Sequence, residues 1–486
     1  MQTETHGHDE TTIIPNILHQ LWIGTKPRPA KLMETWKTLN PHFWYVVWDE
    51  AALASQQWEC LREIEAMQEI NGKADIYRWE ILHRYGGVFV DADSICCEPL
   101  DSALFLSKSA FFSFENENVR QGLVSTGTMG FVPQHPLLKD IIQWIQCEEA
   151  HRMIRQYKAW YSVGPALLTR MLNTGHYSDC FVFGSHTFLP VHFTGPVYWG
   201  HKKVYAHQEW GTAHNSYERM NDSVLPPELR RPDEWVSILI SSYNTRASYV
   251  GECLRSIQAQ EGYFGMEIVW VNDGSDFEHT ASLKTALAIF QQTSRWTTVR
   301  YAEWTENRGT RFSLNHGIYL CNFPLVFKMD SDDIMLPSRI QTQLCFMREH
   351  PDAKICGTNM ILFHDENGEK KRLSQTHHPT TFTLADFMAS TKKPAWFMNH
   401  PTLCFYKTAL LEIGNYKVAE VGHDRSMMED YEMEIGFLKK YGTIYNLPEP
   451  LLHYRVHCEQ LTQRHCAESA AMRELREQIV ESHFSC

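Results

Sequence analysis

The residues most suited to chemistry in this sequence form two acidic motifs, each directly after an apolar run. In one of them, Pro324–Met329 is apolar apart from Lys328, and Asp330, Asp332 and Asp333 follow it. Carboxylates this close repel one another and are costly to desolvate together, so a positive charge should lie among them. A divalent cation that holds a diphosphate is the natural candidate, because hard cations prefer oxygen ligands.

The same pattern occurs in the N-terminal half, where Asp91 and Asp93 follow the apolar run Gly86–Val90. A solvated acidic turn would explain either motif alone. Two such motifs, similarly placed within the two halves, indicate two sites that each bind a metal ion and a nucleotide. The expected metal is Mn²⁺ or Mg²⁺, since carboxylates are the ligands that both ions accept.

The composition narrows the class of protein. A chain of 486 residues is too long for one ordinary core and predicts two domains. The formal net charge of −13 argues against nucleic acid and anionic membranes as main partners, because both need a basic surface. The 13 cysteines include no C-x-x-C motif and indicate reduced thiols. With no apolar stretch that could span a membrane and a polar, acidic start, we expect a cytoplasmic enzyme.

The elements that must position the first acidic pair follow a strand and helix alternation. Phe43–Trp48 is a predicted strand, Ala51–Ile70 has a helical pattern, and the predicted helix Lys73–Tyr85 ends at two glycines before Val88–Val90. An α/β sheet presents ligand sites at the carboxyl ends of such strands. Further along, Phe188–Phe193 is predicted to form a strand.

The second half repeats this alternation. Val236–Ile240, Glu267–Val271 and the strand before Asp330 alternate with predicted helices at Ser248–Gln260 and Ala281–Gln291. The pattern predicts a mainly parallel α/β sheet covered by helices on both faces. A polar, proline-rich stretch before it is the best linker in the chain. The expected segments are a lead-in at 1–12, a domain at 13–220, a linker at 221–234, a domain at 235–465 and a C-terminal helix at 466–486.

Other side chains in the second half could complete a nucleotide-sugar site. Asp273 follows a predicted strand and could accept the N–H of a base such as uracil, while Arg308 could meet a phosphate or ribose. Glu429 and Asp430 lie at a predicted helix start, where an N-cap is the ordinary explanation. As functional groups, one of the two would be a general base that removes a proton from an acceptor hydroxyl.

Residues 235–465 resemble the inverting nucleotide-sugar glycosyltransferases of family 2, which have the GT-A fold. The resemblance rests on Val-Ser-Ile-Leu-Ile-Ser-Ser-Tyr-Asn, Val-Asn-Asp-Gly-Ser-Asp, Asn-Arg-Gly, Met-Asp-Ser-Asp-Asp, Glu-Asp-Tyr-Glu and Tyr-Arg-Val-His, in this order. It implies that Asp273 contacts the base, that Asp330 and Asp332 bind the ribose and the metal, and that Asp430 is the catalytic base. The other expected contacts of a UDP-sugar and its metal ion are Tyr243, Arg308, Arg455 and His457.

Residues 13–215 resemble glycosyltransferase family 32, a group with a GT-A-like fold that retains the anomeric configuration. The matching stretches include Ile-Pro-Asn-Ile-Leu-His-Gln-Leu-Trp-Ile-Gly, Gly-Gly-Val-Phe-Val-Asp-Ala-Asp and Gly-Pro-Ala-Leu-Leu. The resemblance implies that Asp91 and Asp93 bind the metal and that Asp75 and Arg78 contact a UDP- or GDP-sugar. His207, in His-Gln-Glu-Trp, is the candidate for a third metal ligand.

The leading hypothesis is therefore a tandem of two Rossmann-like GT-A domains, a bifunctional glycosyltransferase that adds sugars to a glycan or glycoconjugate acceptor. One alternative is that only one half is active and the other is a degenerate scaffold or glycan-binding module. Another is that the first half is a phosphatase of the haloacid-dehalogenase type, which also places Asp-x-Asp after an apolar strand. The donor sugars, the acceptor and the oligomeric state stay open, because pocket shape sets specificity and motifs do not.

Overall fold

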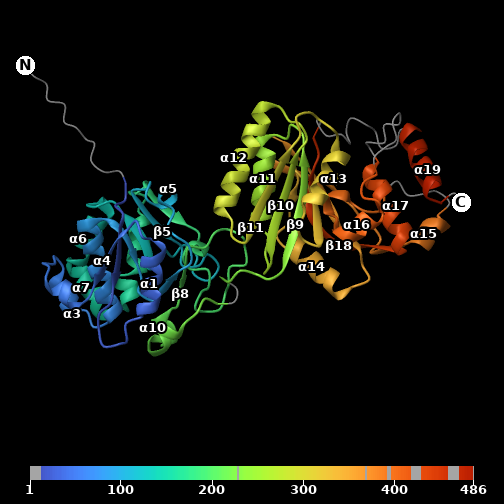
Figure 1. Cartoon of the computed structure of the whole chain (residues 1–486). Coiled ribbons are helices and arrows are strands. Elements are labelled where there is room, and N and C mark those ends of the chain that lie inside the picture. Colours follow the sequence, from blue (N-terminus) through green and yellow to red (C-terminus); the bar gives the residue numbers. More distant parts are fainter. Residues whose placement is uncertain are drawn as a thin grey trace, which may run out of the picture. The chain divides into compact units, whose positions relative to one another are not determined.

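The computed structural model describes residues 13–226, 229–366, 369–390, 396–417, 428–457 and 470–484. The chain divides into two compact units (Figure 1). The first runs to Tyr198 and resumes at Lys203–Leu229; the second takes the short segment Trp199–Lys202 and the chain from Arg230 onward. The second division falls inside the stretch predicted as a linker. The expected lead-in lies outside the described residues.

The first unit is built on a six-stranded sheet in the order β2-β1-β3-β6-β5-β7, in which β1 pairs in parallel with β2 and β3. Its strands are β1 (Ile17–Leu21), β2 (Trp44–Trp48), β3 (Gly87–Val90), β4 (Ser94–Cys96), β5 (Ala110–Ser113), β6 (Thr128–Phe131), β7 (Cys180–Phe183) and β8 (Ala206–Gln208). Its helices are α1 (Ala30–Leu39), α2 (Glu50–Ala54), α3 (Leu61–Ala66), α4 (Ile70–Tyr85), α5 (Ser102–Phe105), α6 (Pro136–Ile145), α7 (Glu148–Gln156), α8 (Ala159–Ser162), α9 (Pro165–Leu172) and α10 (Gly211–His214).

Both faces of this sheet are buried. On β3, Phe89 packs into one apolar cluster with residues of α4 and α6, whereas Val88 and Val90 pack into another with Trp36 of α1 and Phe105 of α5. Side chains alternate between the faces of a strand, so a continuous apolar run such as β3 requires a cover on each side. The sheet is thereby a rigid support for whatever follows β3.

The second unit is built on a ten-stranded sheet whose first four strands, β11-β10-β9-β12, are all parallel. Its strands are β9 (Trp235–Ser242), β10 (Gly265–Asn272), β11 (Thr297–Glu303), β12 (Leu325–Asp330), β13 (Ile334–Met335), β14 (Ile355–Glu366), β15 (Glu369–Gln375), β16 (Thr381–Thr383), β17 (Cys404–Tyr406) and β18 (Thr443–Arg455). Its helices are α11 (Ala247–Gln258), α12 (Phe277–Thr293), α13 (Thr310–Leu320), α14 (Arg339–Glu349), α15 (Leu384–Ala389), α16 (Lys407–Glu412), α17 (Glu429–Tyr441) and α19 (Ala470–Phe484).

Helices cover this sheet from both sides as well, with α11 and α12 on one face and α13, α16 and α17 on the other (Figure 1). On β12, Phe327 and Met329 belong to the first cluster and Val326 to the second. Each unit therefore has the α/β architecture with a mainly parallel sheet that the sequence predicts. Within the described residues, no helix is both long and apolar enough to cross a membrane.

Two predicted elements of the first unit differ from the structure. The predicted helix at 51–70 is broken into α2 and α3, because the carboxylate of Glu80 accepts the N–H groups of Glu59 and Cys60 at 2.7 and 2.8 Å and so holds a separate helix start. The predicted strand at 188–193 does not form. Pro190 lacks the N–H that a ladder needs, and the segment has only an isolated bridge between Val191 and Val197.

Candidate functional site

The first acidic motif lies at the carboxyl end of β3, and helix α4 supplies its counter-ion. Arg78 Nη2 lies 2.5 Å from Asp91 Oδ1, and Arg78 Nη1 lies 3.4 Å from Asp75 Oδ1. Arg78 Nη1 also donates to the carbonyl of Thr126, in the loop before β6. Arg78 and Asp75 are buried and Asp91 is partly exposed. Arg78 thus joins Asp75, which the family 32 resemblance assigns with it to the donor sugar, to Asp91, which the resemblance assigns to the metal.

Asp93 is held by a different segment, around β8. The side-chain amide of Gln208 donates to Asp93 Oδ1 at 2.6 Å and lies 3.5 Å from Asp91 Oδ2. The N–H of Gly211 donates to Asp93 Oδ2 at 2.9 Å. The antiparallel pairing of β4 with β8, which sets Ser94 opposite Gln208, brings the two segments together. Both oxygens of Asp93 are therefore oriented by hydrogen bonds.

Gln208, rather than His207, reaches the acidic pair. Neighbouring residues of a strand point to opposite faces, so only one of the two can face Asp91 and Asp93. His207 Nε2 lies 3.4 Å from a carboxylate oxygen of Glu209. The structure sets Gln208 beside the acidic pair, and the role of His207 as a metal ligand stays a prediction. The motif His-Gln-Glu-Trp marks the segment, but strand alternation selects the residue after the histidine.

The acidic site of the first unit carries more negative than positive charge. Burial raises the pKa of Asp91 to about 7 against the opposing effect of Arg78, and it raises the pKa of Asp75 to about 6. Burial raises the pKa of Asp93 as well. One guanidinium faces three carboxylates, so a bound divalent cation would offset the remaining charge. The donor set of the two carboxylates Asp91 and Asp93 fits Mn²⁺ or Mg²⁺.

In the second unit, the acidic motif follows β12, and its first counter-ion comes from the same strand. Lys328, which is buried, donates through Nζ to Asp330 Oδ1 and to the carbonyl of Met329. Lys328 and Asp330 are two residues apart on a strand and so share one face. Burial alone would raise the pKa of Asp330, but the ammonium of Lys328 and its neighbours hold that pKa below its ordinary value.

Asp332 and Asp333 are held by the end of β18. His457 Nε2 lies 2.8 Å from Asp332 Oδ2, as the sequence predicts for residues of one metal site. Asp333 Oδ1 accepts the backbone N–H of Arg455 at 2.9 Å, whereas its buried Oδ2 has no hydrogen-bond partner among the residues that the structure describes. Burial, followed by the charges of Asp332 and Asp330, raises the pKa of Asp333 well above its ordinary value. This second surplus of buried carboxylate also fits a divalent cation.

Arg455 has a structural position that differs from its predicted contact with the nucleotide. Its side chain is 1% exposed and pairs with Asp365 and, at 2.6 Å, with Glu252, while its Nε donates to the carbonyl of Asp332 at 2.7 Å. The guanidinium also lies over the ring of Tyr249, 4.2 Å from its centroid. Arg455 therefore holds the acidic turn in place and is turned away from solvent.

Asp273, at the end of β10, fastens the loop before α13. Its two carboxylate oxygens each accept a backbone N–H at 2.9 Å, from Arg308 and from Gly309. The guanidinium of Arg308 lies over the ring of Trp304, 4.8 Å from its centroid, and the side chain is exposed. Tyr243, just after β9, is 53% exposed. These predicted nucleotide contacts all lie at the carboxyl end of the parallel strands.

Glu429 and Asp430 begin helix α17, as predicted. Burial raises the pKa of both groups, and for Glu429, with Asp430 as the second cause, the value is about 8. Asp430 Oδ1 accepts the N–H of Tyr431 at 2.8 Å. The negative charge of Asp330 also raises the pKa of Asp430, and the charge of Lys328 lowers it. The acidic pair and the predicted base therefore share one electrostatic environment.

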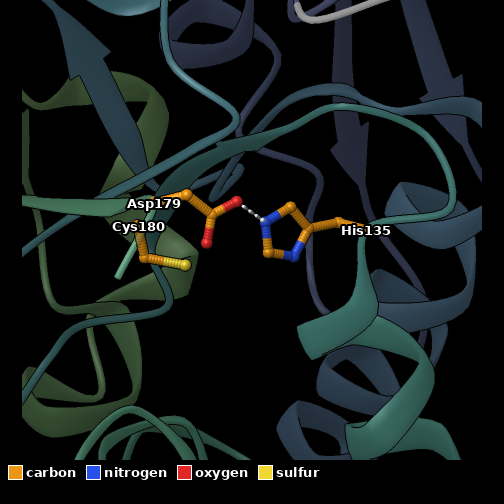
Figure 2. Close-up of side chains that lie close together, drawn as sticks. All are labelled: His135, Asp179 and Cys180. Atoms are coloured by element: carbon orange, nitrogen blue, oxygen red, sulfur yellow. Dashed lines mark hydrogen bonds and ion pairs between the residues drawn. The ribbon is translucent and has the colours of Figure 1, made fainter. Parts of the chain in front are cut away.

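A different set of residues in the first unit, far from Asp91 along the sheet, resembles a metal site. In the described part of the chain, only His135, Asp179 and Cys180 bring three ligand atoms of His, Cys, Asp or Glu within 4.8 Å of one another (Figure 2). The first acidic motif offers two carboxylates and the second offers three, and a nucleotide diphosphate can supply the other oxygens that such an ion requires.

The hydrogen bonds of His135 explain this cluster without a metal ion. Its Nδ1 accepts the N–H of Leu137 at 3.2 Å and so caps α6. The proton of the neutral ring then lies on Nε2, which faces Asp179 Oδ2 at 3.1 Å (Figure 2). Burial, aided by Asp179, raises the pKa of the Cys180 thiol to about 12. A protonated nitrogen and a neutral thiol are poor metal ligands.

Comparison with known families places each acidic motif in a range that matches a glycosyltransferase family. Residues 237–413 match the family described as glycosyl transferase family 2, and this range includes Asp273, Asp330 and Asp332. Residues 27–110 match the family described as glycosyltransferase sugar-binding region containing DXD motif, which includes Asp91 and Asp93. Both resemblances that the sequence predicts are confirmed.

Three curated relatives illustrate the similarity. The amylovoran biosynthesis glycosyltransferase AmsE of Erwinia amylovora is 29% identical over 47% of this chain and 79% of its own length. The O-antigen biosynthesis glycosyltransferase WbnJ of Escherichia coli is 28% identical over 49% of this chain and 88% of its own. The inositol phosphoceramide mannosyltransferase 2 of Schizosaccharomyces pombe is 28% identical over 42% of this chain, which spans about half (56%) of that relative's length. Among solved structures, S. aureus TarS 1-349 is 17% identical with a TM-score of 0.34, over 45% of this chain and 60% of that chain.

The contrast between Gln208 and His207 gives a testable prediction. In a chain that also carries Asp330→Asn to silence the second motif, Gln208→Leu should weaken Mn²⁺ binding by roughly 10- to 100-fold, because Asp93 loses the amide that orients it. His207→Asn should change the affinity by about twofold or less. Isothermal titration calorimetry with Mn²⁺ measures both, and a larger loss from the His207 variant would restore the histidine as the ligand.

Arg455 gives a second prediction, on stability. Arg455→Met should lower the unfolding free energy of the second unit by about 1–3 kcal/mol, because Asp365 loses its buried partner and Glu252 keeps only Lys370. The matched control is Arg348→Met, which breaks an ion pair with Glu234 between more exposed side chains and should cost about 0–1 kcal/mol. Urea unfolding followed by tryptophan fluorescence measures the difference. Equal losses would show that Arg455 is not an anchor.

Proposed function

We propose that this chain, a glycosyltransferase by both of its family matches, transfers sugars from nucleotide-sugar donors to a glycan acceptor at two separate sites. The observation that carries the proposal is that both acidic motifs end a buried strand and gather more carboxylates than cations. Each motif also lies in a range that matches a different transferase family. If only one site bound a metal ion, the excess of buried negative charge at the other site would stay without a compensating cation.

In the first unit, Asp91 and Asp93 would hold Mn²⁺ or Mg²⁺, with Gln208 as the group that orients Asp93. A bound cation would neutralise the departing diphosphate of a UDP- or GDP-sugar. Arg78 and Asp75 present a donor and an acceptor of hydrogen bonds beside the metal ligands, which suits the hydroxyl groups of the transferred sugar. We expect retention of configuration by a front-face mechanism, as the family 32 resemblance implies.

In the second unit, Asp330 and Asp332 would hold the cation, with His457 beside Asp332. Asp273 would accept the base N–H of a UDP-sugar, and the exposed Tyr243 and Arg308 lie at the same end of the sheet. Asp430, as the general base, would take the proton of the acceptor hydroxyl while the oxygen of that hydroxyl attacks the anomeric carbon and displaces the diphosphate in line. This single displacement inverts the anomeric carbon and passes through an oxocarbenium-like transition state.

The acceptor class that we propose is a growing polysaccharide or a glycoconjugate, because AmsE and WbnJ are named for amylovoran and O-antigen biosynthesis. The location that we propose is the cytoplasm, because the sequence has an odd number of cysteines, 13, with no C-x-x-C motif. Two transferases in one chain would raise the local concentration of the first product near the second site.

The two-site proposal predicts that the two acidic motifs can be silenced separately. The variants are assayed with Mn²⁺ and UDP-glucose, UDP-galactose, UDP-N-acetylglucosamine and GDP-mannose. Asp91→Asn should lower the turnover of one donor by about 100-fold or more and leave the turnover of another unchanged. Asp330→Asn should do the reverse. Nucleotide release, followed by chromatography, is the measurement.

The controls for that experiment are Asp101→Asn and Asp386→Asn, which change exposed carboxylates that cap helices of the first and second unit and leave a side chain that can also cap. Both controls should keep full turnover of every donor. Loss of all turnover from just one of the two motif variants would mean that only that unit is catalytic and that the other is a scaffold or a glycan-binding module.

The raised pKa of the predicted base gives a prediction on pH. A base must be ionised to act, so transfer by the second unit should fall as the pH drops through the pKa of Asp430, which burial raises above that of an ordinary aspartate. Asp430→Asn should abolish transfer while donor binding persists. Glu429→Gln should keep transfer and move the acidic limb to lower pH, because one of two repelling carboxyls is removed. If the acidic limb does not move in Glu429→Gln, the charge of Glu429 does not affect the pKa of the base.

A further inference from the structure

Three aromatic side chains of the first unit, from the end of α7 and from α8, are exposed close to one another. Tyr157, Trp160 and Tyr161 are 52%, 43% and 38% exposed. The ring of Tyr161 lies 5.1 Å from that of Tyr157 and 5.6 Å from that of Trp160, between centroids. Large aromatic side chains are normally drawn into the core, so a group of exposed rings marks a surface that meets a ligand.

The backbone of Trp160 borders the acidic site directly. A Cβ at Gly164 would lie 2.6 Å from Asp75 Oδ2 and 3.2 Å from Trp160 Cα, so both groups lie within contact of one point. Asp75 in turn pairs with Arg78, which binds Asp91. The turn between α8 and α9 thus presents Trp160 next to the residues proposed to hold the donor sugar.

The other side of the site reaches Trp160 through Arg120. The guanidinium of Arg120 lies 5.1 Å from the ring centroid of Trp160 and 5.5 Å from that of Phe193. The ring of Phe193 lies 5.1 Å from that of Trp210, whose neighbour Gly211 donates to Asp93. A continuous rim of rings and one guanidinium therefore connects the Asp75 side of the site to the Asp93 side.

We propose that Trp160 and Arg120 form the acceptor subsite of the first unit, where a pyranose ring of the glycan stacks on the indole. This inference rests on the proposed function and adds the binding chemistry of the second substrate. The C–H face of a pyranose is apolar and matches an aromatic ring, whereas its hydroxyls need partners in the ring plane. Arg120, only partly exposed and held by the buried Glu115 at 3.2 Å, offers N–H donors to the hydroxyl oxygens.

Burial distinguishes this subsite from the donor site. The groups proposed to bind the donor, Asp75 and Arg78, are 7% and 5% exposed, as suits a diphosphate sugar that is enclosed with its metal ion. Trp160 lies beside them and is far more exposed, as suits one sugar of a longer chain that must enter and leave. A single indole platform with one arginine is also matched in size to one sugar ring rather than to a protein surface, which needs a much larger area.

The test compares Trp160→Ala with Trp44→Ala in the full chain carrying Asp330→Asn. Trp44 is a matched control, because it is 73% exposed and lies on the edge strand β2 of the same unit. The probes are methyl α-D-glucopyranoside, methyl α-D-mannopyranoside and methyl β-D-galactopyranoside. Saturation-transfer NMR should show that at least one probe binds the Asp330→Asn chain with Trp160 intact. Adding Trp160→Ala should weaken this binding by about five- to tenfold, whereas adding Trp44→Ala should leave it unchanged. Trp160→Phe should restore part of the binding.

A second readout separates this inference from the proposed function. Hydrolysis of the donor without acceptor should be the same in Trp160→Ala and the wild type, while the KM for transfer to the probe that binds should rise by the same five- to tenfold. If the first unit hydrolyses no donor, the proposed function fails, and the NMR result still decides whether the subsite exists. The inference is overturned if no probe binds the wild type, or if Trp160→Ala and Trp44→Ala behave alike.

Discussion

The repulsion among carboxylates at the end of a buried strand is the constraint on which both units depend. Asp91 and Asp93 follow β3, whereas Asp330 ends β12 and Asp332 and Asp333 follow it. Bringing such groups out of water is unfavourable, and the raised pKa of Asp91 and of Asp333 shows that burial opposes their charge. Only a sheet packed on both faces can hold the groups in place against that repulsion, and both sheets have this construction.

The two units meet this constraint with different internal cations. In the first unit, Arg78 comes from the helix before the acidic strand and binds carboxylates on two elements. In the second, Lys328 on the strand itself faces Asp330, and Arg455 on β18 fixes the turn that follows. Neither arrangement supplies as much positive as negative charge. The deficit is a property of both sites, and it is what makes a divalent cation with a nucleotide diphosphate a suitable ligand for each.

Sequence patterns predict the site residues that come at the end of a buried strand. They do not predict the residues that a second strand brings to the site by pairing. Asp91 and Asp330 follow continuous apolar runs, which predict buried strands. Gln208 lies on a strand of three residues that carries no periodicity of its own, and its position is set by pairing with β4. Arg455 has the residue type of a phosphate ligand, and only its burial shows that it serves the fold. Long-range pairing and burial are the two quantities that residue spacing does not contain.

The geometry of the nucleotide side also depends on a residue with no functional group. Gly274 follows Asp273 with φ at +71°, and a Cβ there would lie 2.2 Å from the carbonyl carbon of Glu306. Only glycine allows the two loops to approach this closely without strain. That approach is what brings the N–H groups of Arg308 and Gly309 to the carboxylate of Asp273. Each carboxylate oxygen can accept two hydrogen bonds and here accepts one, so one position on each is still available for the N–H of a base. A side chain at position 274 would therefore separate the loops and misplace Asp273, although it would touch neither the metal ligands nor the base.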